Sequence, residues 1–290
     1  IAAPAGGTLS NGDQTLTIPL AGLTGLSVQL GGGDDTLTID YSGGVIPVPV
    51  EFAGGGQATA TGDALVVTGG SFATATHTFA AADSGVIDFG GAAGAITYSG
   101  LEPVDMTGTT VGNLVLNLPT AIANQAVLEA NGSFNQIRSL NGTFETTAFS
   151  DPTGSLTINR GTDQDTLSAT DLPNFTASLA LGAAAAPFAA VSFDGSLTLA
   201  AGTALAAAAL SVAATTGTVA VTDGTVTVLA DQVTLAAGTA LTAGTGVVTL
   251  APVTDGRAID LGGPDTATAL GLTDAELDAV TPSRLTVGRA

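Results

Sequence analysis

The sequence contains no cysteine, no lysine and no tryptophan. The absence of cysteine excludes disulfide bonds, thiolate metal ligands and a cysteine nucleophile. Because lysine is absent, five arginines face 25 acidic residues, and the formal net charge is −20. Binding to a nucleic-acid backbone or to an anionic membrane surface needs clustered positive charge. Since no run is long and apolar enough for a membrane helix either, we expect neither a nucleic-acid partner nor membrane insertion.

Aromatic side chains are also scarce, at 4% of the residues, although hydrophobic residues make up 45%. Large side chains normally fill a globular core, whereas alanine and valine suit a thin core in which each position stacks on a similar one. Short alternating stretches such as residues 14–20 (QTLTIPL) and 113–118 (NLVLNL) are separated by Gly, Asp, Asn or Ser, which favour turns. The composition therefore favours an all-β protein of stacked short strands.

An exact repeat lies in the last third of the chain. Residues 198–205 (TLAAGTAL) recur letter for letter as residues 234–241, 36 residues later. A fixed-period recurrence of short strands is typical of a solenoid, in which each turn buries its apolar face against its neighbours. Half of this offset predicts a turn of about 18–20 residues.

One helix is expected, over residues 273–280. Thr273 is followed three residues later by Glu276, the pattern of a capping box, and a closing strand is expected over residues 283–287. We interpret the chain as one continuous body, with a less regular half over residues 1–193 and a more regular half over residues 194–290. Residues 1–10 are rich in small side chains and are expected to form either a free terminus or an arm that adds a strand to a neighbouring subunit.

Several phrases carry a resemblance to a known class of proteins. They include residues 197–205 (LTLAAGTAL), 226–241 (VTVLADQVTLAAGTAL) and 259–290 in the regular half, and residues 31–40 (GGGDDTLTID) in the other half. The chain resembles the repeat regions of filamentous-haemagglutinin-like and autotransporter-type giant bacterial surface proteins. The resemblance implies a right-handed parallel β-helix that is exported to the cell surface and used for adhesion or matrix formation. Such proteins are far longer, so we expect a fragment or a processed subunit.

Calcium is the metal that the sequence favours. In the RTX nonapeptide G-G-x-G-x-D-x-L-x, glycines allow the turn and the Asp shares a Ca²⁺ with the next turn. Residues 30–38 (LGGGDDTLT) place Asp35 at the metal position, and residues 160–167 (RGTDQDTL) offer Asp163 and Asp165. The two copies are isolated, whereas a bound ion requires consecutive copies. The alternative is therefore an aspartate turn stabilised by its own hydrogen bonds.

Catalysis is not expected. A polysaccharide lyase needs basic residues, and a hydrolase needs a paired acid and base. The only histidine, His77, lies in an alternating stretch (TATHTF) as an ordinary strand residue, and pairs such as Asp163 and Asp165 arise easily among 25 acids. Rows of threonine, which could order water in an ice-binding protein, do not recur at one fixed offset.

The sequence thus predicts a non-enzymatic, secreted or cell-surface structural protein without a cofactor, calcium excepted. Its partners would be other copies of itself, neighbouring surface proteins, or host or matrix glycans. The alternative function is that of a self-assembling filament subunit. Its copies would join end to end through exposed strand edges, because the ends of a solenoid carry unpaired strands.

Overall fold

The computed structural model describes residues 8–10, 15–59, 62–172, 175–213, 218–221 and 224–289. Regular structure in these ranges is β-strand except for one short helix, so the predicted all-β class is confirmed. Of residues 1–10, expected to be a terminus or an arm, residues 1–7 lie outside the described part of the chain. No helix in the described ranges has the length and apolar character needed to span a membrane.

The strands are short in most places, and four of them are long enough to bend around a corner of the body. The strands before residue 160 are β1 (Thr8–Ser10), β2 (Thr15–Thr17), β3 (Leu26–Gly32), β4 (Thr36–Asp40), β5 (Val50–Gly56), β6 (Ala64–Ala81), β7 (Ser84–Asp88), β8 (Ile96–Ser99), β9 (Val104–Asn117), β10 (Gln125–Asn131), β11 (Phe134–Ser139), β12 (Thr147–Phe149) and β13 (Ser155–Asn159). The later elements are β14 (Thr166–Ala169), β15 (Ser178–Leu181), β16 (Phe188–Phe193), β17 (Leu197–Leu199), β18 (Thr203–Val212), β19 (Thr218–Val221), β20 (Thr225–Leu235), β21 (Ala240–Thr242), β22 (Val247–Ala251), β23 (Ala258–Leu261), β24 (Ala269–Leu272), α1 (Asp274–Asp278), β25 (Val280–Thr281) and β26 (Arg284–Val287).

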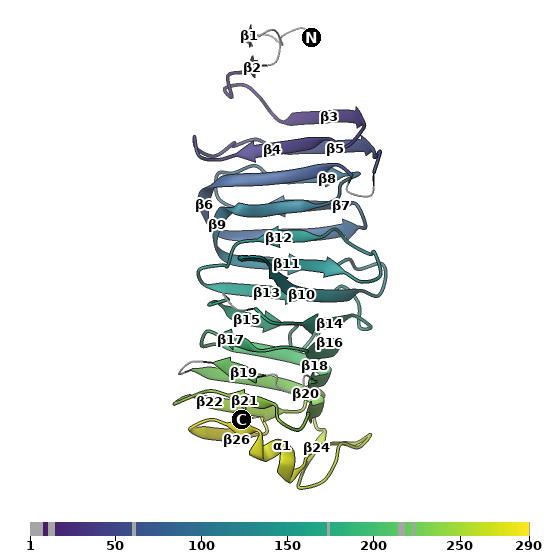
Figure 1. Ribbon diagram of the computed structural model, residues 1–290, viewed down its shortest axis with the longest axis vertical. Coiled ribbons are helices and arrows are strands. Elements are labelled where there is room, and N and C mark those ends of the chain that lie inside the picture. Colours follow the sequence, from purple (N-terminus) through teal and green to yellow (C-terminus); the bar gives the residue numbers. More distant parts are fainter. Residues whose placement is uncertain are drawn as a thin grey trace.

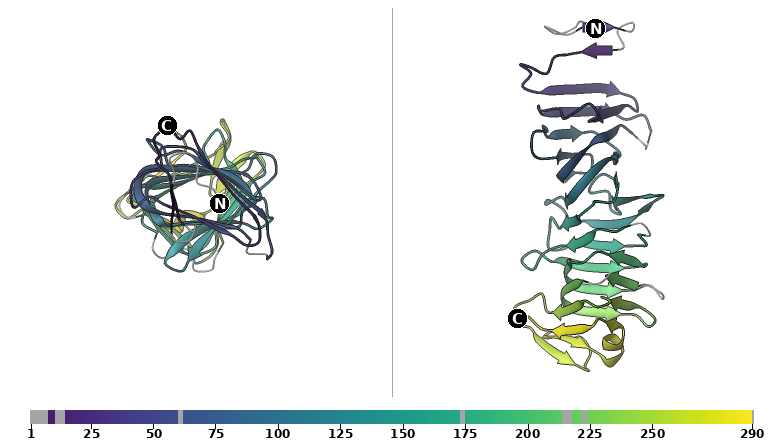
Figure 2. Two further views of the ribbon diagram at one scale, coloured as in Figure 1. Left: turned by 90° about the horizontal axis from the view of Figure 1, so that it is seen from above. Right: turned by 90° about the vertical axis from the view of Figure 1, so that its left-hand side faces the viewer.

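The body is elongated, with β3 and β4 towards one end and α1, β24 and β26 at the other (Figure 1). Viewed down the long axis, the strands surround a single interior (Figure 2). Eighteen strands belong to one sheet, and β17, β19, β21 and β25 form a separate four-stranded sheet. The chain therefore winds repeatedly around one core.

Apolar side chains of successive windings stack in register inside this core. Ile158 pairs with Leu116 on one side and Leu181 on the other, and the row continues through Leu205 and Val228. All five side chains are buried. Burying such a side chain contributes about 1.5–3 kcal/mol, and the buried apolar cluster is continuous from Ile39 to Val280. Like-on-like stacking thus holds the whole length of the body together.

The prediction of a right-handed parallel β-helix is wrong. That fold would sort its strands into separate, all-parallel sheets, whereas the 18-stranded sheet is mixed and continuous. β7 lies antiparallel between β6 and β8, and β11 lies antiparallel between β10 and β12. These hairpins interrupt the parallel pairs and join windings that a simple solenoid would keep apart.

The predicted turn length is also wrong. Leu205 pairs with Val228, 23 residues later, and Val228 pairs with Leu250 after a further 22 residues. Earlier in the chain the step is longer, since Leu114 pairs with Leu156, 42 residues later. Neither spacing matches the 36-residue offset or its half. The exact repeat therefore does not mark equivalent positions of successive windings.

Instead, the repeat encodes one kind of corner. In both copies the glycine has a φ of 87°, at Gly202 and Gly238, a conformation that other residues rarely adopt. In both copies the next threonine donates its hydroxyl to the carbonyl of the alanine three residues before it, at 3.0 Å for Thr203 and 2.7 Å for Thr239. The first copy leads from β17 into β18, and the second leads from β20 into β21.

The predicted capping box is confirmed. Glu276 donates its backbone N–H to the hydroxyl of Thr273 at 3.3 Å, and Thr273 donates its own N–H to the Glu276 carboxylate at 3.0 Å. The helix α1 ends at Asp278, two residues earlier than expected, and β26 forms where a closing strand was predicted. Together with β23 and β24, this segment covers the C-terminal end of the body (Figure 1).

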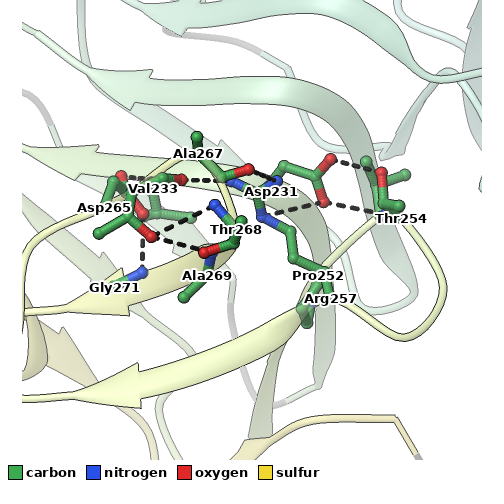
Figure 3. A network of polar contacts seen from close by, with 12 residues as sticks. Asp231, Val233, Pro252, Thr254, Arg257, Asp265, Ala267, Thr268, Ala269 and Gly271 are labelled. Carbon is green, nitrogen blue, oxygen red and sulfur yellow. Dashed lines mark hydrogen bonds and ion pairs between the residues drawn. The ribbon is translucent and has the colours of Figure 1, made fainter.

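A polar network attaches this covering segment to β20 (Figure 3). Asp231 on β20 accepts hydrogen bonds from the backbone N–H of Thr254 at 2.9 Å and from its hydroxyl at 2.5 Å. Arg257 lies 3.8 Å from the same carboxylate and donates to two backbone carbonyls of the covering segment. Asp265 accepts from the N–H of Val233 at 3.0 Å. Side chains from both partners therefore satisfy the backbone where the end segment meets the body.

We predict that Asp231→Asn lowers the free energy of unfolding by about 1–3 kcal/mol, because a largely buried arginine and two donors lose a charged acceptor. Asp255→Asn is the matched control. Asp255 pairs with Arg289, but its side chain is 88% exposed against 15% for Asp231, so its loss should cost no more than about 0.5 kcal/mol. Urea denaturation of both variants measures the difference, and equal losses would contradict the structural role of the network.

Candidate functional site

A cavity of about 420 Å³ opens on the side of the body where two carboxyl groups meet. Its walls come from the segment before β9 and from the segments on either side of residue 142. The lining residues are Glu102, Pro103, Ser139, Gly142, Phe144, Glu145 and Thr146. The cavity combines apolar walls with two acidic side chains and no basic one.

The strand register explains why the two glutamates are neighbours. β12 runs parallel to β9, with Thr147 opposite Val104, and Val104 donates its N–H to the carbonyl of Thr146 at 2.9 Å. Two residues before this pair, the same register places Glu145 opposite Glu102. The two residues are 43 apart in the sequence and meet only through this pairing.

Glu145 is the unusual group in the cavity. It is only 3% exposed, and none of the hydrogen bonds or ion pairs within the described ranges involves its carboxyl group. Burial raises the pKa of Glu145 to about 9, and the nearby charges of Glu102 and Asp83 raise it further. Glu145 therefore holds its proton at neutral pH and can act as a hydrogen-bond donor or as a weak acid.

A second polar group lies in the core near the cavity. The His77 Nε2 lies 2.7 Å from the hydroxyl of Tyr98, and its Nδ1 lies 3.3 Å from the hydroxyl of Thr147. Burial lowers the pKa of His77 to about 3, so the ring is neutral. Burial, with the charges of Glu145 and Asp83, raises the pKa of Tyr98 far above its usual range. Both ring nitrogens have partners, so His77 is a satisfied core residue.

Phe144 separates the cavity from this core. It is buried, and its ring centroid lies 4.8 Å from that of Phe79. Phe79 also stacks on His77, at 4.1 Å between ring centroids. The cavity therefore has a rigid aromatic wall.

The structure gives Asp165 a purely structural environment. It is fully buried, and its two oxygens accept from the N–H groups of Asn124, Gly161 and Thr162, the amide of Asn124 and the hydroxyl of Thr162, at 2.6–3.1 Å. Burial alone would raise the pKa of Asp165, but these hydrogen bonds outweigh it and hold the pKa below its ordinary value. A Cβ at Gly161 would overlap the carbonyl oxygen of Pro119. The RTX-like glycine and aspartate therefore serve a tight corner.

The other two calcium candidates lie elsewhere. Asp163 is exposed beside Asp165. Asp35 lies between β3 and β4, where its backbone N–H donates to the buried carboxylate of Asp63 at 2.7 Å, while the adjacent Asp34 accepts from the next winding. β4 and β14 lie in different parts of the body (Figure 1), so the structure does not bring Asp35 together with Asp163 and Asp165. Within the described ranges, no group of three or more His, Cys, Asp or Glu side chains could hold a metal ion.

Sequence reasoning missed the pair of Glu102 and Glu145. Each lies in an unremarkable stretch, ITYSGLEPVD and GTFETTAF, and their relation depends on the pairing of β9 with β12. His77 was interpreted as an ordinary strand residue, and alternation gave no sign that both its nitrogens are bonded in the core.

No protein-family model, curated protein or solved structure matches this chain. The resemblance to giant bacterial surface proteins thus rests on the sequence phrases alone.

The two buried titratable groups predict opposite pH slopes. Between about pH 4.5 and 9 the folded chain keeps a proton on Glu145 that the unfolded chain releases, so stability falls as pH rises, by at most about 1.4 kcal/mol per unit. Between about pH 3 and 6.5 the unfolded chain protonates His77 and the folded chain does not, so stability falls as pH falls.

Glu145→Gln should therefore flatten the alkaline slope, and His77→Gln should flatten the acidic one. Denaturation midpoints from pH 4 to 9 measure both slopes, with Glu51→Gln, an exposed glutamate on β5, as the control. If Glu145→Gln keeps the parental slope above pH 6.5, the assignment of a protonated Glu145 is wrong.

Asp165→Ala should lower the free energy of unfolding by about 3 kcal/mol or more, because it leaves several buried donors without an acceptor. Asp163→Ala, two residues away and exposed, should have little effect. We also expect the melting temperature of the parent to be the same in millimolar Ca²⁺ and in chelator. A higher Tm in Ca²⁺ that Asp165→Ala abolishes would restore the calcium hypothesis.

Proposed function

We propose that this chain is a non-enzymatic structural protein of the bacterial cell surface or extracellular matrix. In this role its elongated, acidic body would act as a stiff spacer or wall in adhesion. The observation that carries the proposal is the single apolar core, continuous from Ile39 to Val280. A body without an internal break transmits force and keeps its length, as a scaffold requires.

The use of the polar residues supports the same role. His77, the usual candidate for acid–base catalysis, is buried with both ring nitrogens bonded. Asp165 is saturated by donors of its own corner. These groups stabilise the body and are not available to a substrate.

The acidic surface suggests the kind of partner. Three ion pairs form in the described part of the chain, each with an arginine, and most carboxylates therefore have no cationic partner. Partners would be neighbouring copies, other surface proteins, or glycans of a host or matrix. Charge of one sign also keeps such bodies apart until a specific contact forms.

A filament subunit is the second candidate, and the free strand edges at the N-terminal end favour it. Among the described residues, β3 pairs only with β5, and β4 pairs only with β6. Leu26 donates its N–H to Pro49 on the β5 side, so the N–H of Ser27 points to the open edge, since alternate residues of a parallel strand face opposite neighbours. An added strand could pair there.

Electron microscopy and sedimentation at increasing concentration separate the two candidates. We expect particles of constant length, as a scaffold that does not polymerise would give. Long fibres would instead favour the filament subunit. In that case Ser27→Pro, which removes an edge donor without touching the bond of Leu26 to Pro49, should shorten them, and Ser84→Pro, on the internal strand β7, should not do so without also unfolding the chain.

A further inference from the structure

We propose that the cavity between Glu102 and Glu145 binds an organic cation, an alkylammonium or guanidinium group. This inference does not rest on the structural role proposed above, because it concerns one cavity and would hold for any function of the body. The cation could be a small amine or the side chain of a lysine or arginine from a partner protein.

The unpartnered carboxyl of Glu145 is the observation that calls for a ligand. Buried polar groups are almost always hydrogen-bonded, and leaving one unpaired costs about 1–3 kcal/mol. Glu145 is 97% buried, from its 3% exposure, and lines the cavity without a partner in the described ranges. A donor placed in the cavity would satisfy it.

The surrounding charges specify a cation. Glu102 lines the same cavity, Asp83 lies close enough to affect Glu145, and no arginine lines the cavity. The other group that interacts with Glu145 is Tyr98, whose hydroxyl faces His77. Every titratable neighbour is therefore neutral or acidic, and a positive charge would gain from all of the acids at once.

The walls favour an organic cation over a metal ion. Ca²⁺ takes six to eight oxygen ligands, and the cavity offers two carboxyl groups among apolar walls. Pro103 and the ring of Phe144 instead suit the methylene stem of a lysine or arginine side chain, and an aromatic face attracts a cation. A cavity of about 420 Å³ has room for such a side chain.

Binding must also release a proton. At neutral pH Glu145 carries a proton, which it has to lose to form an ion pair with an ammonium group. The balance is one carboxylic acid and one alkylammonium giving one carboxylate–ammonium pair and one H⁺ in solution. Binding should therefore tighten as pH rises from 7 towards 9, unlike simple attraction to a surface that is already ionised.

Calorimetric titration of the whole chain with n-butylammonium and with n-butylguanidinium tests the proposal. Neutral n-butanol and CaCl₂ serve as comparison probes. We expect saturable binding of at least one cation, with up to one proton released per cation in buffers of different ionisation enthalpy. Glu145→Gln should weaken binding at least tenfold and abolish proton release, Glu102→Gln should weaken it with release retained, and Glu51→Gln should change neither.

Four results would overturn the proposal: no binding of either cation, equal binding of n-butanol, equal weakening by Glu51→Gln, or binding of Ca²⁺ alone. Because Gln matches Glu145 in its neutral form, Glu145→Gln should fold, and its unfolding curve verifies this. A Gly-Ser peptide with one central lysine then distinguishes the sources. Peptide binding as tight as that of n-butylammonium indicates a protein side chain, and binding of the free amine alone indicates a small molecule.

Discussion

The fold depends on aspartate side chains that accept backbone N–H groups from the neighbouring winding. Asp34 accepts from Ala58 and Thr59, and Asp231 accepts from Thr254. At a corner the ladder between strands ends and leaves N–H groups that need an acceptor, and an ionised carboxylate is a strong one. The negative charge of the chain is thus partly architectural, since these acids pair with backbone donors and need no arginine or lysine.

Local features of the fold could be predicted from the sequence because short-range chemistry determines them. Alternation identified many of the strands, and the spacing of Thr273 and Glu276 identified the capping box. The path of the chain could not be predicted in this way. The 36-residue repeat records a shared corner geometry, at Gly202 and Gly238, which two different corners of one winding can use equally well. Sequence identity therefore indicated similar turns, and it was mistaken for similar places.

The antiparallel strands did leave a signal that periodicity arguments overlooked. Asn131 and Gly132 lie between β10 and β11, and Gly132 has a φ of 64°. Asn-Gly between two alternating runs is a strong hairpin signal. A hairpin within a set of parallel windings inserts a strand without completing a winding, which lengthens the step there to about 40 residues, as between Leu114 and Leu156. The irregular half is irregular because of these insertions.

The same insertion creates the candidate site. β11 and the loop after it carry the chain back to β12, whose pairing with β9 places Glu145 beside Glu102. A core of stacked alanine, valine and leucine has no use for a buried carboxyl group, and glutamine or leucine would avoid the cost of desolvating one. Nothing in the packing of Phe144 or Thr147 requires an acid at the position between them. The retention of a glutamate there is therefore more easily understood as a feature of the cavity than of the core.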